Sequence, residues 1–224
     1  LKPSYWQGPG AVLVYARDLG GTWQIEDQLG AEGGASTGEG LSPSIAVSGD
    51  LLVVAAGDAG ERWGAHVFRR NALRAWSSVE TLPLASSPGG GAAQWNYAAL
   101  VELLQPPLRA VATDGERTLV AEIGGFGALR VFERDVGSGS MVEQARLERS
   151  EPQNDDQFGA SLAISGDVAI VGAPRHGQSG AAYVFSRDPV SGEWSEDALI
   201  PAPSPFPESD FGAAVAIDDE VAPI

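Results

Sequence analysis

A five-residue segment recurs four times along the chain and limits the folds that the chain can adopt. Each copy begins with Val, continues with an aromatic residue, and has Arg at its fourth position before Asp or Asn; the copies are residues 14–18, 67–71, 131–135 and 184–188. Their first residues lie 53, 64 and 53 positions apart. Internal repeats of this length are typical of solenoids, propellers and related arrays. The fold class is therefore predicted from the repeat rather than from any single local pattern.

Each repeat contains four short segments with the alternation of β-strands. The five-residue segment ends a first strand, and a second begins nine or ten residues after its Val, at Trp23, Trp76, Met141 or Trp194. Apolar and polar residues alternate in these segments, which predicts strands with one buried face. A second hairpin precedes this one, because residues 41–50, 158–167 and 211–220 align with one another and a β-branched run follows each turn. Four antiparallel strands per repeat of roughly 50 residues predict the blade of an all-β propeller.

The repeats divide the chain into blades. We expect an outer half blade at residues 1–31, full blades at 35–86, 108–150 and 151–203, and an inner half blade at 204–224. An insertion at 87–107 lengthens the middle step, and residues 92–104 within it have the apolar spacing of about three helical turns. An insertion in a loop between blades is a common place for an individual function, so this segment either packs on the blades or binds a partner.

The third full blade carries motifs of a known family. Phe158-Gly159 is followed by Gly172-Ala173-Pro174, and Phe-Gly recurs at 211–212. The chain resembles the FG-GAP repeat family, whose blades form the head of integrin α-chains and occur in many bacterial surface proteins. The motif is weaker elsewhere: Leu41-Ser42 replaces Phe-Gly in the first full blade. The resemblance implies a β-propeller with an adhesion or scaffold role outside the cytoplasm, either extracellular, at the cell surface or periplasmic.

Calcium is the ion that the resemblance would suggest, because many blades of this family hold it in an Asp-x-Asp-x-Asp-Gly loop. Calcium requires six to eight oxygen ligands. The corresponding turns here are short, at residues 48–50, 114–116, 165–167 and 218–220, and carry few carboxylates. We therefore expect no calcium or other cofactor, with turn geometry as the role of these Gly and Asp residues.

The charge of the chain narrows its partners. Lys and Arg number 14 against 30 Asp and Glu, a net charge of −16. An acidic chain repels phosphate backbones and anionic lipid, so we expect no nucleic-acid partner. No apolar run reaches the roughly 20 residues of a membrane span. The partner classes that fit this charge are a protein ligand or a glycan. Disulfides, thiolate metal sites and cysteine nucleophiles are excluded because the chain has no Cys.

The candidate binding residues lie in expected loops. Arg175 and His176 fall between the second and third strands of the last full blade, and Trp63, Trp95 and Tyr97 fall outside the repeated tryptophan position. Because the repeated tryptophans occupy one position of the unit, we expect them to pack between blades, with carbohydrate stacking as the alternative. Neither histidine has the spacing of a metal site.

Three functions fit these observations, and three arrangements would close the ring. The first function is an adhesion or scaffold module that binds protein through its loops. The alternatives are a lectin-like glycan binder and a propeller glycoside hydrolase, whose carboxylates would have to converge in a central channel; we expect no catalytic residue.

The two half blades could pair within one chain, two chains could associate into a larger ring, or the chain, which begins and ends abruptly, could be a piece of a longer propeller.

Overall fold

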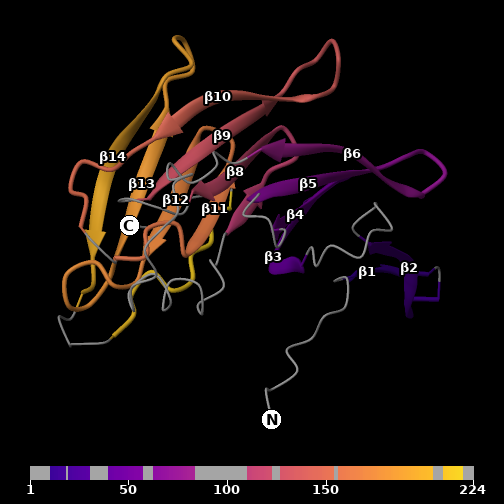
Figure 1. Cartoon of the computed structure of the whole chain (residues 1–224), viewed down its shortest axis with the longest axis horizontal. Helices are drawn as coiled ribbons and strands as arrows, with labels where there is room; N and C mark the ends of the chain where they lie inside the picture. Colours follow the sequence, from indigo (N-terminus) through magenta and orange to yellow (C-terminus); the bar gives the residue numbers. More distant parts are fainter. Residues whose placement is uncertain are drawn as a thin grey trace, which may run out of the picture.

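The structure is a computed structural model, and it describes residues 11–18, 20–30, 40–57, 63–83, 110–122, 127–153, 156–203 and 209–218. These residues form three four-stranded antiparallel sheets and one two-stranded sheet, each made of strands consecutive in sequence. The sheets follow one another across the molecule in chain order (Figure 1). The predicted all-β architecture of propeller blades is confirmed. Within the described ranges, no helix is long and apolar enough to cross a membrane.

The strands fall into an outer hairpin and three blades, which we number in chain order. The outer hairpin is β1 (Ala11–Arg17) and β2 (Trp23–Gly30). The strands of blade 1 are β3 (Gly40–Ser48), β4 (Leu51–Gly57), β5 (Trp63–Arg70) and β6 (Trp76–Pro83). Those of blade 2 are β7 (Val111–Thr113), β8 (Arg117–Glu122), β9 (Ala128–Arg134) and β10 (Met141–Leu147). Those of blade 3 are β11 (Ser161–Ser165), β12 (Val168–Ala173), β13 (Ala181–Arg187) and β14 (Trp194–Pro201).

The first turn of blades 1 and 3 shows why these short sequences fold as tight hairpins. Ser48 pairs with Leu51, and Ser165 pairs with Val168, so only two residues connect each pair of strands. Gly49 has φ of 57° and Gly166 has φ of 52°. Two-residue hairpins require a positive φ in the turn, which glycine adopts without strain. The sequence Ser-Gly-Asp thus fixes the register of both strands.

The core lies between blades, because each sheet is apolar on both faces. We call the side of a blade that faces its N-terminal neighbour the backward face and the other side the forward face. On β4, Leu52 and Val54 pack backward against β1 and β2, whereas Leu51 and Val53 pack forward against blade 2. A third cluster joins the forward face of blade 2 to the backward face of blade 3. A strand that is buried on both faces consists of consecutive apolar residues, as residues 51–55 do.

The large residue that begins each outermost strand was expected to pack between blades. β2, β6, β10 and β14 do begin at Trp23, Trp76, Met141 and Trp194. Trp76 and Met141 are buried in inter-blade clusters and Trp194 packs against a third. Trp23 is exposed, so the packing prediction is wrong there. The reason is positional: Trp23 lies on the backward face of the outer hairpin, where no described blade precedes it.

The described part of the last half blade, residues 209–218, lies against blade 3. Phe211 forms a parallel bridge with Gly180, and Ser161 Oγ donates a hydrogen bond of 2.7 Å to Gly212 O. A Cβ on Gly172 would lie 1.9 Å from Gly212 O, so this approach requires glycine at 172. The Phe-Gly of one repeat therefore docks on the Gly-Ala-Pro of the preceding one. The insertion at 87–107, with its expected helix, lies outside the described residues.

Candidate functional site

The blades have a turn end and a loop end. The turns between first and second strands and between third and fourth strands lie at the turn end. In blade 3, the loop 174–180 between the second and third strands lies at the opposite end, as do the described residues of the connector that enters the blade (Figure 1). In blade 3, the connector 148–160 and the loop 174–180 are neighbours, because β11 begins where β12 ends: Ser161 pairs with Gly172. This loop end contains Arg175 and His176, two of the residues that the sequence predicts to bind a ligand.

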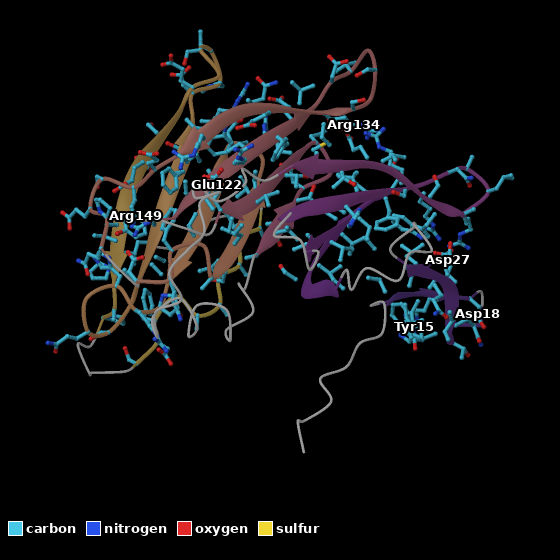
Figure 2. The ribbon with its side chains drawn as sticks, in the orientation of Figure 1. Tyr15, Asp18, Asp27, Glu122, Arg134 and Arg149 are labelled. Atoms are coloured by element: carbon cyan, nitrogen blue, oxygen red, sulfur yellow. The ribbon has the colours of Figure 1, made fainter. Side chains whose placement is uncertain are left out.

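A buried ion pair holds the connector in place. Arg149 Nη2 lies 2.8 Å from Asp156 Oδ1, with 1% and 3% of the two side chains exposed. Arg149 also donates to Gln153 O at 3.1 Å, and its guanidinium stacks 4.5 Å from the centre of the Phe158 ring. Asp156 Oδ1 in turn accepts the Phe158 N–H at 3.1 Å. Charged hydrogen bonds of this kind fix a loop strongly once both charges are buried together. Figure 2 shows Arg149 at this end of blade 3.

His176 joins the loop 174–180 to the same cluster. Its Nδ1 lies 3.1 Å from Tyr183 Oη and 3.6 Å from Asp156 Oδ2. Burial raises the pKa of Tyr183 to about 12, so its hydroxyl stays protonated, and it donates to Glu151 O at 3.3 Å. A hydroxyl that donates its proton elsewhere can only accept from the imidazole, which assigns the proton of a neutral His176 to Nδ1. Asp156 Oδ2 has no hydrogen-bond partner among the described atoms.

Backbone contacts lock the two loops into one unit. Gln153 Oε1 accepts the Gly177 N–H at 3.0 Å, and the Arg175 N–H donates to Asp156 O at 3.1 Å. The His176 N–H closes the turn on Ala173 O at 3.0 Å. Hydrogen bonds therefore hold the described residues of the two segments together, and a surface held in this way loses less conformational entropy when it binds a ligand.

Arg175 is the exposed cation of this unit, where Glu148 and Glu151 are exposed as well. Its backbone is held, but its side chain is exposed and makes no hydrogen bond or ion pair to another described residue. The other arginines in the described ranges do make such contacts: Arg17, Arg69, Arg70, Arg74, Arg117, Arg130, Arg134, Arg146, Arg149 and Arg187. The arrangement thus presents one guanidinium to a ligand, with five N–H donors suited to a carboxylate.

The acidic residues of the turn end are used inside the molecule. Asp167 lies 3.4 Å from both Arg117 and Arg187, and Asp50 lies 3.8 Å from Arg134. Asp114 Oδ1 accepts the N–H groups of the two residues at the end of its own turn, 116 and 117. These carboxylates link blades or cap turns. No group of three or more His, Asp or Glu residues in the described part of the chain is arranged to hold a metal ion.

The structure brings together two of the five residues predicted to bind a ligand. Arg175 and His176 share one turn at the loop end, the first exposed and the second half-buried. Trp63 begins β5, and its side chain is not described; Trp95 and Tyr97 lie outside the described residues.

Sequence reasoning missed the residues that fix this turn. They are Arg149, Gln153, Asp156 and Tyr183. In the sequence, only their nearness to the Phe-Gly and Gly-Ala-Pro motifs points to them. The alternation of apolar and polar residues that predicts strands does not extend into the connector, and it does not show that Tyr183 on β13 contacts His176.

Comparison with known proteins agrees with the blade architecture. Residues 141–185 match the FG-GAP repeat family. This segment runs from β10 of blade 2 through β13 of blade 3, so it includes the whole connector and the loop with Arg175 and His176. A search of curated protein sequences found no match.

A search of solved structures found the crystal structure of a protein from Lactobacillus plantarum, with a TM-score of 0.50 and 17% sequence identity. The alignment covers 91% of this chain and 51% of that one, so the chain spans about half the length of its structural neighbour. At this identity the likeness concerns the fold alone. The chain is therefore an all-β array of propeller blades that contains an FG-GAP repeat at residues 141–185.

Proposed function

We propose that this chain is a binding module that recognises a protein ligand through the loop end of blade 3, in an adhesion or scaffold role outside the cytoplasm. The observation on which the proposal rests is the exposed Arg175 on a turn whose backbone is fixed by Asp156 and Ala173. Arginine is enriched among the residues that dominate protein interfaces. A fixed turn lowers the entropy lost on binding.

The composition of the loop end favours protein over glycan. Sugar-binding sites stack aromatic side chains on the ligand, yet Phe158 and Tyr183, the aromatic residues of this unit, are buried. Among the described residues of this unit, the exposed ones are mostly polar or charged, such as Glu151, Gln153 and Arg175, and none is aromatic. The chain carries −16 overall, which repels a strongly acidic partner. The ligand that fits is a protein surface of neutral or basic character that places one carboxylate against Arg175.

Selection from a displayed peptide library tests this proposal with the folded chain as bait. We expect enriched peptides to contain Asp or Glu and to lose at least tenfold in affinity for Arg175→Ala, the loss of one charged hydrogen-bonding group at an interface. Val190→Ser is the matched control, because Val190 is exposed in the β13–β14 turn at the opposite end. Peptides that bind Arg175→Ala as tightly as the unchanged chain would refute the site.

A glycan array on the same protein tests the alternative. Glycan binding without peptide selection would replace the proposal by the lectin function. If the chain binds neither peptides nor glycans, this loop end is not a ligand-binding site.

A further inference from the structure

The outer hairpin exposes apolar residues at repeat positions that are buried in the other blades. Tyr15 occupies the position of Phe68, yet 51% of Tyr15 is exposed against 2% of Phe68. Trp23 occupies the position of Trp76, with 64% exposed against 9%. In blade 1 the cover is supplied by β1 and β2 of the outer hairpin. The backward face of the outer hairpin is therefore a blade-packing surface that no blade in the described part of the chain covers.

The same comparison extends this surface onto blade 1. Val47 on β3 occupies the position of Ile164 on β11, and it is 61% exposed against 8%. Ile164 is covered because the inner strands β7 and β8 of the preceding blade pack on β11. The outer hairpin has no such inner strands among the described residues. The exposed apolar residues of the outer hairpin and of β3 are together called the open face: Leu13, Tyr15, Trp23, Ile25, Ile45 and Val47.

The forward face of blade 3 is the counterpart of the open face. Val184 lies at the position of Val67 and Val131, which are fully buried against the following blade. Val184 is only partly buried, as are Val168 and Ile170 beside it on β12. Residues 209–218, which lie on blade 3 as the first strand of a further blade would, supply the inner part that the outer hairpin lacks. The two ends of the chain thus carry the two halves of one blade interface.

We propose that the open face binds the forward face of blade 3 and residues 209–218 of a second copy of this chain, head to tail. In the structure the outer hairpin and blade 3 lie at opposite ends of the described array, with blades 1 and 2 between them, so these two faces do not meet within one molecule (Figure 1). The contact would continue the packing already repeated between the blades of one chain. A head-to-tail contact closes into a ring if its rotation allows and otherwise extends as a filament.

Light scattering on the purified chain over a range of concentrations tests the association. We expect a mass of at least twice the 23.2 kDa of one chain, reduced to that of one chain by Trp23→Glu with Ile25→Glu. Both side chains are exposed in the single molecule, so the variant should fold. Val136→Glu is the matched control, since Val136 is exposed in the β9–β10 turn of blade 2, which carries neither of the two proposed faces. The control should keep the mass of the unchanged chain.

Mixing two variants tests the head-to-tail geometry. Val184→Glu alters only the forward face, so its mixture with the open-face variant retains one intact contact and should regain association that neither variant shows alone. Circular dichroism checks that Val184→Glu is folded, and Val184→Ser replaces it if it is not.

Three results would overturn the proposal. The first is a mass of one chain at every concentration. If Trp23→Glu also lowered the melting temperature of that single chain, the open face would be covered by the C-terminal segment of the same chain. The second is association that the open-face variant leaves unchanged. The third is association that Val184→Glu does not affect, which would indicate open face against open face.

Discussion

Among individual side chains, Arg149 and Asp156 make the contact on which the loop end most depends. Both are buried, and Asp156 also accepts the Phe158 N–H and, through its carbonyl, the Arg175 N–H. The pair links the connector, the Phe-Gly motif and the exposed turn. Removing one partner of a buried ion pair leaves the other as an uncompensated charge, which costs more than the pair itself contributes.

We predict that Asp156→Ala destabilises the chain by about 3 kcal/mol in urea unfolding, because Arg149 is then buried without its counter-ion. The double variant with Arg149→Met should recover part of this loss, since no charge remains buried. Arg74→Ala is the matched control: Arg74 pairs with Glu26 at 3.3 Å but is mostly exposed, so its loss should cost less than about 1 kcal/mol. A single variant no less stable than the Arg74 control would show that the pair does not hold the connector.

Within a blade, the strands of blade 2 are tied by a second group of charges. Glu122 on β8 accepts hydrogen bonds from Arg130 Nε on β9 at 2.6 Å and from Arg146 Nε on β10 at 2.9 Å. Figure 2 marks Glu122 on this blade. Burial raises the pKa of Glu122, but the hydrogen bonds and charges of the two arginines outweigh burial and hold the pKa below its usual value of 4.5. The carboxylate is thus more stable in the folded chain than in the unfolded one.

This shift predicts a pH-dependent stability. A carboxyl group with a lowered pKa stabilises the fold fully above its unfolded pKa of 4.5, and the contribution is lost as pH falls through the lower folded value. We expect Glu122→Gln to be less stable than the unchanged chain by about 1 kcal/mol at pH 7, with the gap narrowing below pH 4.5. Urea unfolding at several pH values measures the gap, with Glu143→Gln, which touches only Arg130, as the weaker control. A gap that stays constant with pH would contradict the assignment.

The elements also show what sequence could and could not predict. The starts of β2, β6, β10 and β14 were predicted from Trp23, Trp76, Met141 and Trp194, because period-two alternation is a local property of a strand. The connector was not predicted, since its contacts join Arg149 to Asp156 and Asp156 to His176 across irregular backbone. Likewise, repetition predicted burial for every copy of the tryptophan, whereas burial depends on a neighbouring blade that the copy at 23 lacks.

Across the whole molecule, the blades stack through equivalent faces, and the two faces that no described blade covers lie at the ends of the array. Between blades 2 and 3, Arg117 lies 3.4 Å from Asp167 and Arg187 lies 3.9 Å from Glu133, so charges reinforce the apolar interface at the turn end. The loop end has a different character: its connector and turn are fixed internally and leave Arg175 exposed. The two proposals therefore concern different parts of the molecule: assembly is proposed at the ends of the array, and ligand binding at the loop end of blade 3.

The most direct test of ligand binding at the loop end is amide hydrogen exchange of the chain, measured with and without a peptide from the library selection. A bound ligand slows exchange of the amides it covers, and the footprint does not depend on any substitution. The account predicts slower exchange in residues 149–153 and 174–178, with no change in the β13–β14 turn at 188–193. Protection confined to 188–193, or spread over the strands without the loop end, would contradict it.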